Sequence, residues 1–186
     1  MKYLILSDIH SNREALTAIV SFVKRKKWDK VVFLGDLVTE KSRAVVVVHP
    51  NNPTGSFLKR NEAEALIALS ARRGLAIIAD EVFADFVLQG EVAAAHPTFA
   101  LESPALSFAL GGLSKSCALP QMKLGWIAVS GPASLRDEAL TRLEFIADTY
   151  LSVATPVQLA LPGVLARKAA LQAPIRSRLA RNLEAL

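Results

Sequence analysis

The sequence predicts an α/β fold, with a mostly parallel sheet flanked by helices. Short apolar runs of strand length alternate with segments in which apolar residues recur at helical spacing. Several of these runs end on an aspartate or a glycine, which is typical of strands that lead into loops. Hydrophobic residues make up 52% and charged residues 21% of the 186 residues. This balance indicates a packed core rather than a disordered chain.

The first 40 residues predict a βαβ unit. Residues 3–7 and 31–34 are apolar strands, and residues 12–27 between them have helical periodicity with Asn12 as a possible N-cap. A helix of this length joins two parallel strands. We expect these strands to extend the sheet formed by the rest of the chain.

The remaining elements continue the α/β pattern. We expect a helix over residues 59–73, with Leu66, Ile67 and Leu69 on its apolar side and Gly74 as its C-terminal cap. Trp126 and Phe108 are expected in the core. The predicted strands cover residues 44–48, 75–79, 105–110 and 124–129. After Pro132 a helical C-terminal tail is predicted, interrupted at Pro156, Pro162 and Pro174.

Composition excludes several classes of protein. The single cysteine, Cys117, rules out an intrachain disulfide, so a disulfide-stapled secreted domain is not expected. The first residues lack the layout of a signal peptide, and no apolar run approaches the length of a membrane span. The net charge of +5 suits anionic ligands but does not indicate nucleic acid. We therefore expect a cytoplasmic protein without membrane or nucleic-acid partners.

A first set of polar residues follows the two N-terminal strands. Asp8 and His10 come after the first strand and Asp36 after the second. Carboxylates with an imidazole suit Mn, Fe or Zn. The motifs SDIHSN (7–12) and FLGDLV (33–38) resemble the start of the calcineurin-like metallophosphoesterases. The resemblance implies divalent metal ions on these three residues and, as an alternative function, a metal-dependent phosphoesterase. It covers only residues 1–40, and the later motifs of that family are absent, so a βαβ unit keeping only the outline of a site is the other interpretation.

A second set is spread along the rest of the chain. Asn52 lies in the turn HPNNPTG, Asp80 ends an apolar strand, and Lys115 lies in GGLSKS after another strand. Polar groups at the ends of parallel strands can converge on one crevice. A lysine amine with a nearby carboxylate suits an aldehyde cofactor that is bound as a Schiff base.

These residues lie in longer motifs that resemble a known family. The runs HPNNPTG (49–55), IIADEVFADF (77–86) and GGLSKSCALPQMKLGWIAVSGP (111–132) look like the central part of a class I/II, fold type I, pyridoxal-phosphate-dependent aminotransferase. The resemblance implies transfer of an amino group between an amino acid and a 2-oxo acid, with pyridoxal 5'-phosphate as the cofactor. It also implies a homodimer.

The resemblance implies a role for each site residue. Lys115 matches the lysine that forms the Schiff base and moves the proton, Asp80 the aspartate on the ring nitrogen, and Asn52 the asparagine on the ring's phenolate oxygen. Ser114 and Lys123 fall near the positions that hold the cofactor phosphate.

The chain departs from the family pattern at several of these positions. Phe83 stands where many members have a tyrosine that bonds the phenolate oxygen, Gly112 where a serine is common, and Lys123 where an arginine is usual. Lysine replaces bidentate phosphate binding with a point charge.

Compared with the family pattern, we expect this sequence to lack the segments that precede and follow these motifs. We therefore divide the chain into a metallophosphoesterase-like fragment, residues 1–40, and an aminotransferase-like large-domain fragment, residues 44–186. A natural fusion, a rearranged gene and an assembly error all explain such a junction, and a non-catalytic chimeric remnant is a further alternative.

Purely structural roles compete with the functional ones. Asp80 can cap the segment that follows it, and Asn52 can simply shape its turn. His49 is expected to be a turn residue rather than a ligand. The basic segment 167–181 is expected to present a solvated helix face rather than a nucleic-acid surface.

Overall fold

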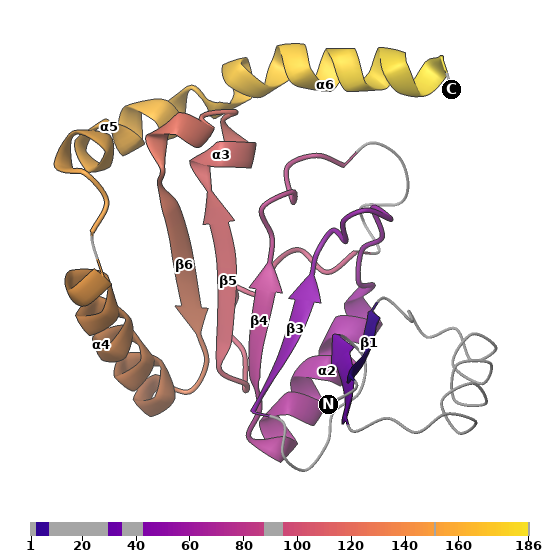
Figure 1. Ribbon diagram of the computed structural model, residues 1–186, viewed down its shortest axis with the longest axis vertical. Helices are drawn as coiled ribbons and strands as arrows, with labels where there is room; N and C mark the ends of the chain where they lie inside the picture. Colours follow the sequence, from indigo (N-terminus) through magenta and orange to yellow (C-terminus); the bar gives the residue numbers. More distant parts are fainter. Residues whose placement is uncertain (1–2, 8–29, 35–42, 88–94, 151, 186) are drawn as a thin grey trace.

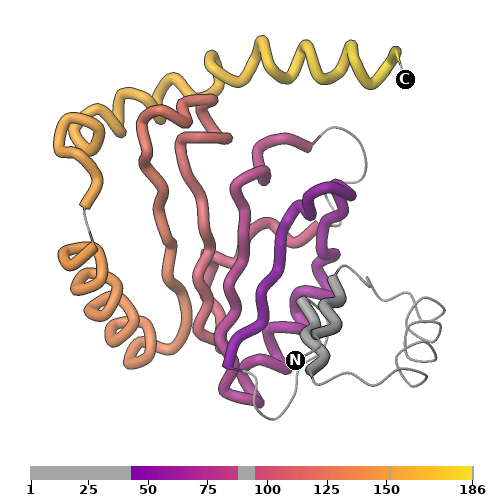
Figure 2. The backbone as a smooth tube through the Cα atoms, viewed as in Figure 1, coloured from indigo at the N-terminus to yellow at the C-terminus, as the bar shows by residue number. Residues whose placement is uncertain are grey.

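A computed structural model describes residues 3–7, 30–34, 43–87, 95–150 and 152–185. Within these ranges the chain forms two separate sheets and a series of helices, which Figure 1 labels in chain order. All the helices of the described residues, and the larger sheet, belong to the chain after residue 43. Figure 2 traces the backbone of the larger sheet and the helices that follow it, up to the long C-terminal helix.

The larger sheet has four strands in the order β3-β4-β5-β6. The strands β3 (Ala44–Val48), β4 (Ala76–Asp80) and β5 (Ser107–Gly112) are parallel, and β6 (Gly125–Ser130) pairs antiparallel with β5. The predicted α/β class with a mostly parallel sheet is therefore confirmed. All four strands lie within two residues of the predicted ranges.

The N-terminal strands form a sheet of their own. β1 (Tyr3–Ser7) and β2 (Lys30–Leu34) are parallel, as predicted, and they pair with each other from Tyr3–Lys30 to Ser7–Leu34. The expectation that they extend the larger sheet is wrong. An alternating apolar pattern marks the faces of a strand, but not the edge along which its backbone will pair. The predicted helix over residues 12–27 lies outside the described residues.

The helix α2 (Arg60–Arg73) covers one face of the larger sheet (Figure 1). It begins after Lys59, whose N–H donates to the Glu62 carboxylate at 2.9 Å, and it ends at Gly74, whose φ of 63° is left-handed. Both ends agree with the prediction. Leu66 and Ile67 pack against a buried core centred on Ala63 and Ile77.

The chain after β5 is helical, apart from β6 and short turns. The segment around Lys115 contains one helical turn, α3 (Leu113–Ser116), followed by the 3-10 helix η2 (Pro120–Met122). The C-terminal tail consists of α4 (Ala133–Tyr150), α5 (Thr155–Ala166) and α6 (Lys168–Glu184). No helix among the described residues is both long and apolar enough to cross a membrane.

Two sequence expectations about this part are corrected. Pro156 lies in the first turn of α5 as a helix start allows, but Pro162 and Pro174 lie inside α5 and α6 instead of interrupting them. Packing accounts for this, because Leu161, Val164 and Leu171 of these helices contact the buried residues Leu113, Cys117 and Leu124. Trp126 was expected in the core but is 38% exposed, since β6 is an edge strand.

Candidate functional site

The three parallel strands of the larger sheet end at one edge. Val48 pairs with Asp80, and Asp80 pairs with Leu110 on the next strand. The backbone pairing continues beyond the strands, with His49 N–H donating to Asp80 C=O at 2.8 Å and Glu81 N–H to Leu110 C=O at 3.0 Å. The loops that follow β3, β4 and β5 therefore start beside one another, and α6 runs across this edge (Figure 1).

Asp80 lies at the last position of β4, on the face away from α2. Ile77 and Ala79 are buried against Ala63 of α2, so the alternate residues, including Asp80, point to the other face. The Asp80 Oδ1 atom accepts a hydrogen bond from Val82 N–H at 3.1 Å. The local capping role that competed with the functional one is therefore present. It uses one carboxylate oxygen, and among the described residues the other oxygen has no hydrogen bond.

Lys115 and Phe83 are brought together from two adjacent loops. Lys115 is exposed on α3, and its Nζ lies over the Phe83 ring at 5.6 Å from the ring centre. This distance is within the range of a cation–π contact. Phe83 belongs to the turn that directly follows Asp80, in which Phe86 N–H donates to Phe83 C=O at 2.9 Å. The amine thus lies over the turn that directly follows the predicted carboxylate.

No side-chain hydrogen bond or ion pair among the described residues joins the other predicted site residues to this pair. Asn52 is exposed, and the turn is shaped by its neighbour Asn51, whose Oδ1 accepts from the Thr54 hydroxyl at 2.9 Å. Ser114 is half-buried next to Lys115. Lys123 is exposed and ends η2 with a left-handed φ of 50°. The predicted roles of Asn52, Ser114 and Lys123 remain predictions.

His49 forms the base of the HPNNPTG turn. It is 1% exposed, its Nδ1 accepts from Leu58 N–H at 3.1 Å, and its Nε2 donates to His96 C=O at 2.8 Å. Because Nδ1 accepts and Nε2 donates, these two bonds assign a ring proton to Nε2. The expectation that His49 is a turn residue is confirmed, although the sequence gives no sign of its partners.

His96 lies next to this ring. Burial, followed by the nearby His49, lowers the pKa of His96. Its Nε2 atom is buried and has no hydrogen-bond partner among the described residues.

Glu81 is a residue that sequence reasoning missed. Its Oε1 accepts from Phe99 N–H at 2.7 Å and its Oε2 from the Thr98 hydroxyl at 2.6 Å. The carboxylate thereby ties the segment before β5 to the end of β4. The only available signal was a second acidic residue directly after Asp80, which does not reveal a partner 17 residues away.

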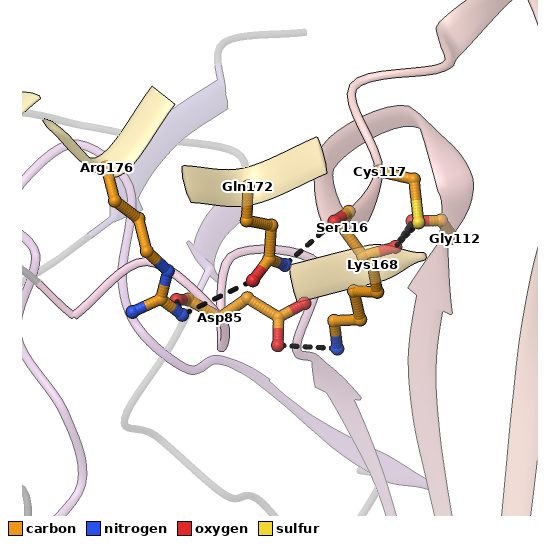
Figure 3. Close-up of polar contacts among 7 residues, drawn as sticks. All are labelled: Asp85, Gly112, Ser116, Cys117, Lys168, Gln172 and Arg176. Carbon is orange, nitrogen blue, oxygen red and sulfur yellow. Dashed lines mark hydrogen bonds and ion pairs between the residues drawn. The ribbon is translucent and has the colours of Figure 1, made fainter. Parts of the chain in front are cut away.

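Helix α6 contacts both the Phe83 turn and the Lys115 helix (Figure 3). Lys168 Nζ pairs with the Asp85 carboxylate at 2.6 Å, and the Arg176 guanidinium donates to Asp85 C=O. Gln172 Nε2 donates to Ser116 C=O at 2.8 Å. The basic segment 167–181 was expected to be a solvated face, but two of its cations bind this chain.

The predicted metal ligands Asp8, His10 and Asp36 lie outside the described residues. Within the described ranges there is no group of three or more His, Cys, Asp or Glu side chains that could hold a metal ion.

Comparison with known proteins gives a family match over most of the chain. The model of the family described as aminotransferase class I and II matches residues 23–185. Nicotianamine aminotransferase B of Hordeum vulgare is 32% identical over 145 residues, which are 75% of this chain and 26% of that protein. Human tyrosine aminotransferase is 29% identical over 151 residues, 80% of this chain and 33% of that protein. The chain thus spans about a third or less of these relatives.

Solved structures show the same fold at low identity. An alanine aminotransferase from Pyrococcus furiosus matches with a TM-score of 0.63 and 19% identity, over 99% of this chain and 47% of that one. A pyridoxal-phosphate-dependent cyclase, OrfR, matches with a TM-score of 0.65 and 23% identity, over 99% and 48%. The comparisons give no support to the resemblance of residues 1–40 to metallophosphoesterases.

Proposed function

The chain belongs to the class I and II aminotransferases, and we propose that it transfers an amino group between an amino acid and a 2-oxo acid with pyridoxal phosphate as its cofactor. Because it spans only part of its relatives, this activity is a proposal for the chain as it stands. The observation that carries it is the position of the Lys115 amine over Phe83, which lies three residues after Asp80 in the chain.

The residues at this edge fit the cofactor. A Schiff base needs an amine that an aldehyde can reach, and Lys115 is exposed. A pyridinium nitrogen needs a carboxylate oxygen as its partner, and one oxygen of Asp80 has no hydrogen bond among the described residues. Asp80 is the last residue of β4 and Lys115 follows the parallel neighbour β5, so both lie at the strand ends where α/β proteins hold their ligands.

The residues of this chain have separate tasks in the proposed reaction. Pyridoxal phosphate, when bound, supplies an aldehyde that condenses with amines and a ring that withdraws electrons. Lys115 Nζ would hold the aldehyde until the substrate amine takes its place, and the freed amine would then accept and return a proton at the substrate carbon. The Asp80 carboxylate keeps the ring nitrogen protonated, and the Asn52 amide donates to the phenolate oxygen.

The phosphate is assigned to two residues near Lys115. The Ser114 hydroxyl donates a hydrogen bond to it, and the Lys123 ammonium supplies a positive charge without the fixed fork of an arginine. We place Phe83 beside the ring, where it offers an apolar surface but no hydroxyl.

The substrate is proposed only as a chemical class. The similar proteins are named for nicotianamine and tyrosine, and a further one, from Haemophilus influenzae, for glutamate and pyruvate at 29% identity. These compounds share an amino or oxo group next to a carboxylate but differ in their side chains. The cyclase among the structural neighbours also shows that this fold alone does not determine the reaction.

The experiment supplies the full chain with pyridoxal phosphate, a panel of amino acids and a 2-oxo acid, and measures the new 2-oxo acid. We expect turnover that is lost in Lys115→Ala and strongly reduced in Asp80→Asn. Lys59→Ala, which removes an exposed amine at the start of α2, is the matched control and should keep full turnover. Equal turnover in Lys115→Ala and the wild type would refute the proposal.

The resemblance of the motifs in residues 1–40 supports a second candidate function, a metal-dependent phosphoesterase. β1 and β2 are parallel, with Ser7 opposite Leu34, so the two described strands end at the same edge. Manganese-stimulated hydrolysis of an aryl phosphate that is lost in Asp36→Asn would support this function. Hydrolysis that manganese does not stimulate would contradict it.

Two further proposals come from the resemblance and the composition. We propose a homodimer, which sedimentation would distinguish from a monomer. We also propose a cytoplasmic location, which cell fractionation would test.

A further inference from the structure

We propose that Gln172 of α6 is a positioning residue that holds the Lys115 helix in place over the Phe83 turn. The proposal rests on the proposed function, because it concerns the amine assigned to the cofactor. It adds a residue that no motif of the sequence indicated.

The helix that carries Lys115 depends on outside contacts. α3 contains only four residues, and so short a helix is not stable by itself. Its last carbonyl groups have no partner within the helix. Gln172 supplies one from 56 residues away, because its Nε2 donates to Ser116 C=O at 2.8 Å. At the other end, the Ser116 hydroxyl donates to Gly112 C=O at 2.8 Å.

Gln172 is well placed to fix this contact. Its side chain is 5% exposed, so the bond to Ser116 forms away from bulk water. Its Oε1 accepts from the Arg176 guanidinium at 3.4 Å, which orients the amide so that Nε2 faces α3 (Figure 3). Both ends of the amide are therefore used. Ser116 directly follows Lys115, so movement of its carbonyl moves the lysine backbone.

Helix α6 also binds the turn that contains Phe83, the residue that the Lys115 amine contacts. Lys168 and Arg176, one turn on either side of Gln172, bind the carboxylate and the carbonyl group of Asp85. Asp85 lies two residues after Phe83 in the turn that follows β4. α6 therefore joins the turn below the amine to the helix that carries it, and Gln172 makes the second of these connections.

The test compares Gln172→Met with Arg181→Ala by hydrogen exchange and by cofactor binding. Methionine keeps the length of the glutamine side chain but cannot donate a hydrogen bond to Ser116 C=O. Arg181→Ala removes the bond from Arg181 to the Ser177 hydroxyl at 2.7 Å, on the same helix but without a contact to α3. Cys117 N–H, which donates to Leu113 C=O at 3.1 Å and closes α3, reports on this helix.

In Gln172→Met we expect the Cys117 amide to exchange at least tenfold faster, while the Ile77 amide in β4 keeps its wild-type rate. If Gln172 only stabilised the whole fold, its loss would instead speed hydrogen exchange of both amides by the same factor, and this result would overturn the proposal. Arg181→Ala should leave both rates unchanged.

With pyridoxal phosphate added, the readout is the visible circular dichroism divided by the absorbance of the bound cofactor. The free cofactor is achiral, so this ratio reports how firmly the protein orients it. We expect Gln172→Met to lower the ratio at least twofold at saturation and to weaken binding about tenfold, as for a lost buried hydrogen bond. An unchanged ratio would overturn the proposal. A wild-type protein that gives no visible band would overturn the proposed function, and exchange alone would then decide whether Gln172 fixes α3.

Discussion

The Nζ atom of Lys115 lies over the ring of Phe83, 5.6 Å from its centre. Both residues belong to loops that follow neighbouring parallel strands, and α6 binds each loop through a different side chain. The proposed reactive amine is thus placed by contacts between segments that are far apart in the chain. Phe83 is therefore the residue whose substitution reports most directly on the surroundings of this amine.

Phe83→Tyr should tighten the binding of pyridoxal phosphate. The resemblance implies a tyrosine hydroxyl at this position that bonds the phenolate oxygen of the cofactor. One added hydrogen bond contributes about 0.5–1.5 kcal/mol, or about a two- to tenfold lower Kd in an absorbance titration. Phe86→Tyr, in the same turn, is the control and should leave the Kd unchanged. Equal Kd values for the two variants would contradict the assignment of Phe83 to the cofactor site.

His49→Phe should destabilise the fold. Phenylalanine keeps a ring between Phe57 and Phe99, but it cannot accept from Leu58 N–H or donate to His96 C=O. Leaving a buried polar group without its partner costs about 1–3 kcal/mol. Urea unfolding measures the loss, with the exposed Asn52→Ala in the same turn as the control. A change in the free energy of unfolding below the error of the fit would contradict this, because it would mean that water replaces the bonds to Leu58 and His96.

The stability of the protein should fall with decreasing pH from about 6.5, partly through His96. Burial and His49 lower the pKa of folded His96, so below the ordinary histidine pKa of about 6.5 the unfolded chain binds more protons. The contribution of His96 is complete above that value and is lost as the pH falls below it. His96→Phe should flatten the decline in the free energy of unfolding between pH 7 and pH 5.5. Parallel profiles for the two proteins would contradict this contribution.

Gly111→Ala should destabilise the protein through a collision with Trp126. A Cβ atom at Gly111 would lie 2.3 Å from Trp126 Nε1, because the two residues are opposite each other on β5 and β6. Moving the indole aside should cost about 1–3 kcal/mol. In a Trp126→Ala background the same change should cost much less, and the double-mutant cycle measures this coupling. Additive effects would mean that the indole does not cover Gly111.

Much of the fold could be predicted from the sequence because its signals are local. The strand ending at Asp80, the helix ending at Gly74 and the turn around His49 each follow from hydrophobic periodicity or from the backbone preferences of particular residues. The errors concern long-range choices. Pro162 and Pro174 stay inside helices because side chains of α5 and α6 pack on the Leu113 core. β1 and β2 pair only with each other among the described strands. Which edges of two strands pair is not marked by the hydrophobic pattern of the sequence.

The candidate site was predictable only in its main residues. Lys115, Asp80 and Asn52 could be selected because their motifs resemble a family. Gln172 and Glu81 could not be selected, since each forms a hydrogen bond to the backbone of a distant segment. Because every residue has the same backbone groups, the sequence of the partner segment does not indicate such a bond. In the same turn as Asn52, the Thr54 hydroxyl donates to Asn51, a contact that the sequence pattern alone does not indicate.

The central claim is that Lys115 is the amine that binds the cofactor, and reductive trapping tests it most directly. The full chain is incubated with pyridoxal phosphate, reduced with borohydride, digested, and mapped by mass spectrometry. We predict one stoichiometric modification, on Lys115, that disappears in Lys115→Ala. A modification spread over exposed lysines such as Lys59 and Lys123, or none at all, would contradict the claim.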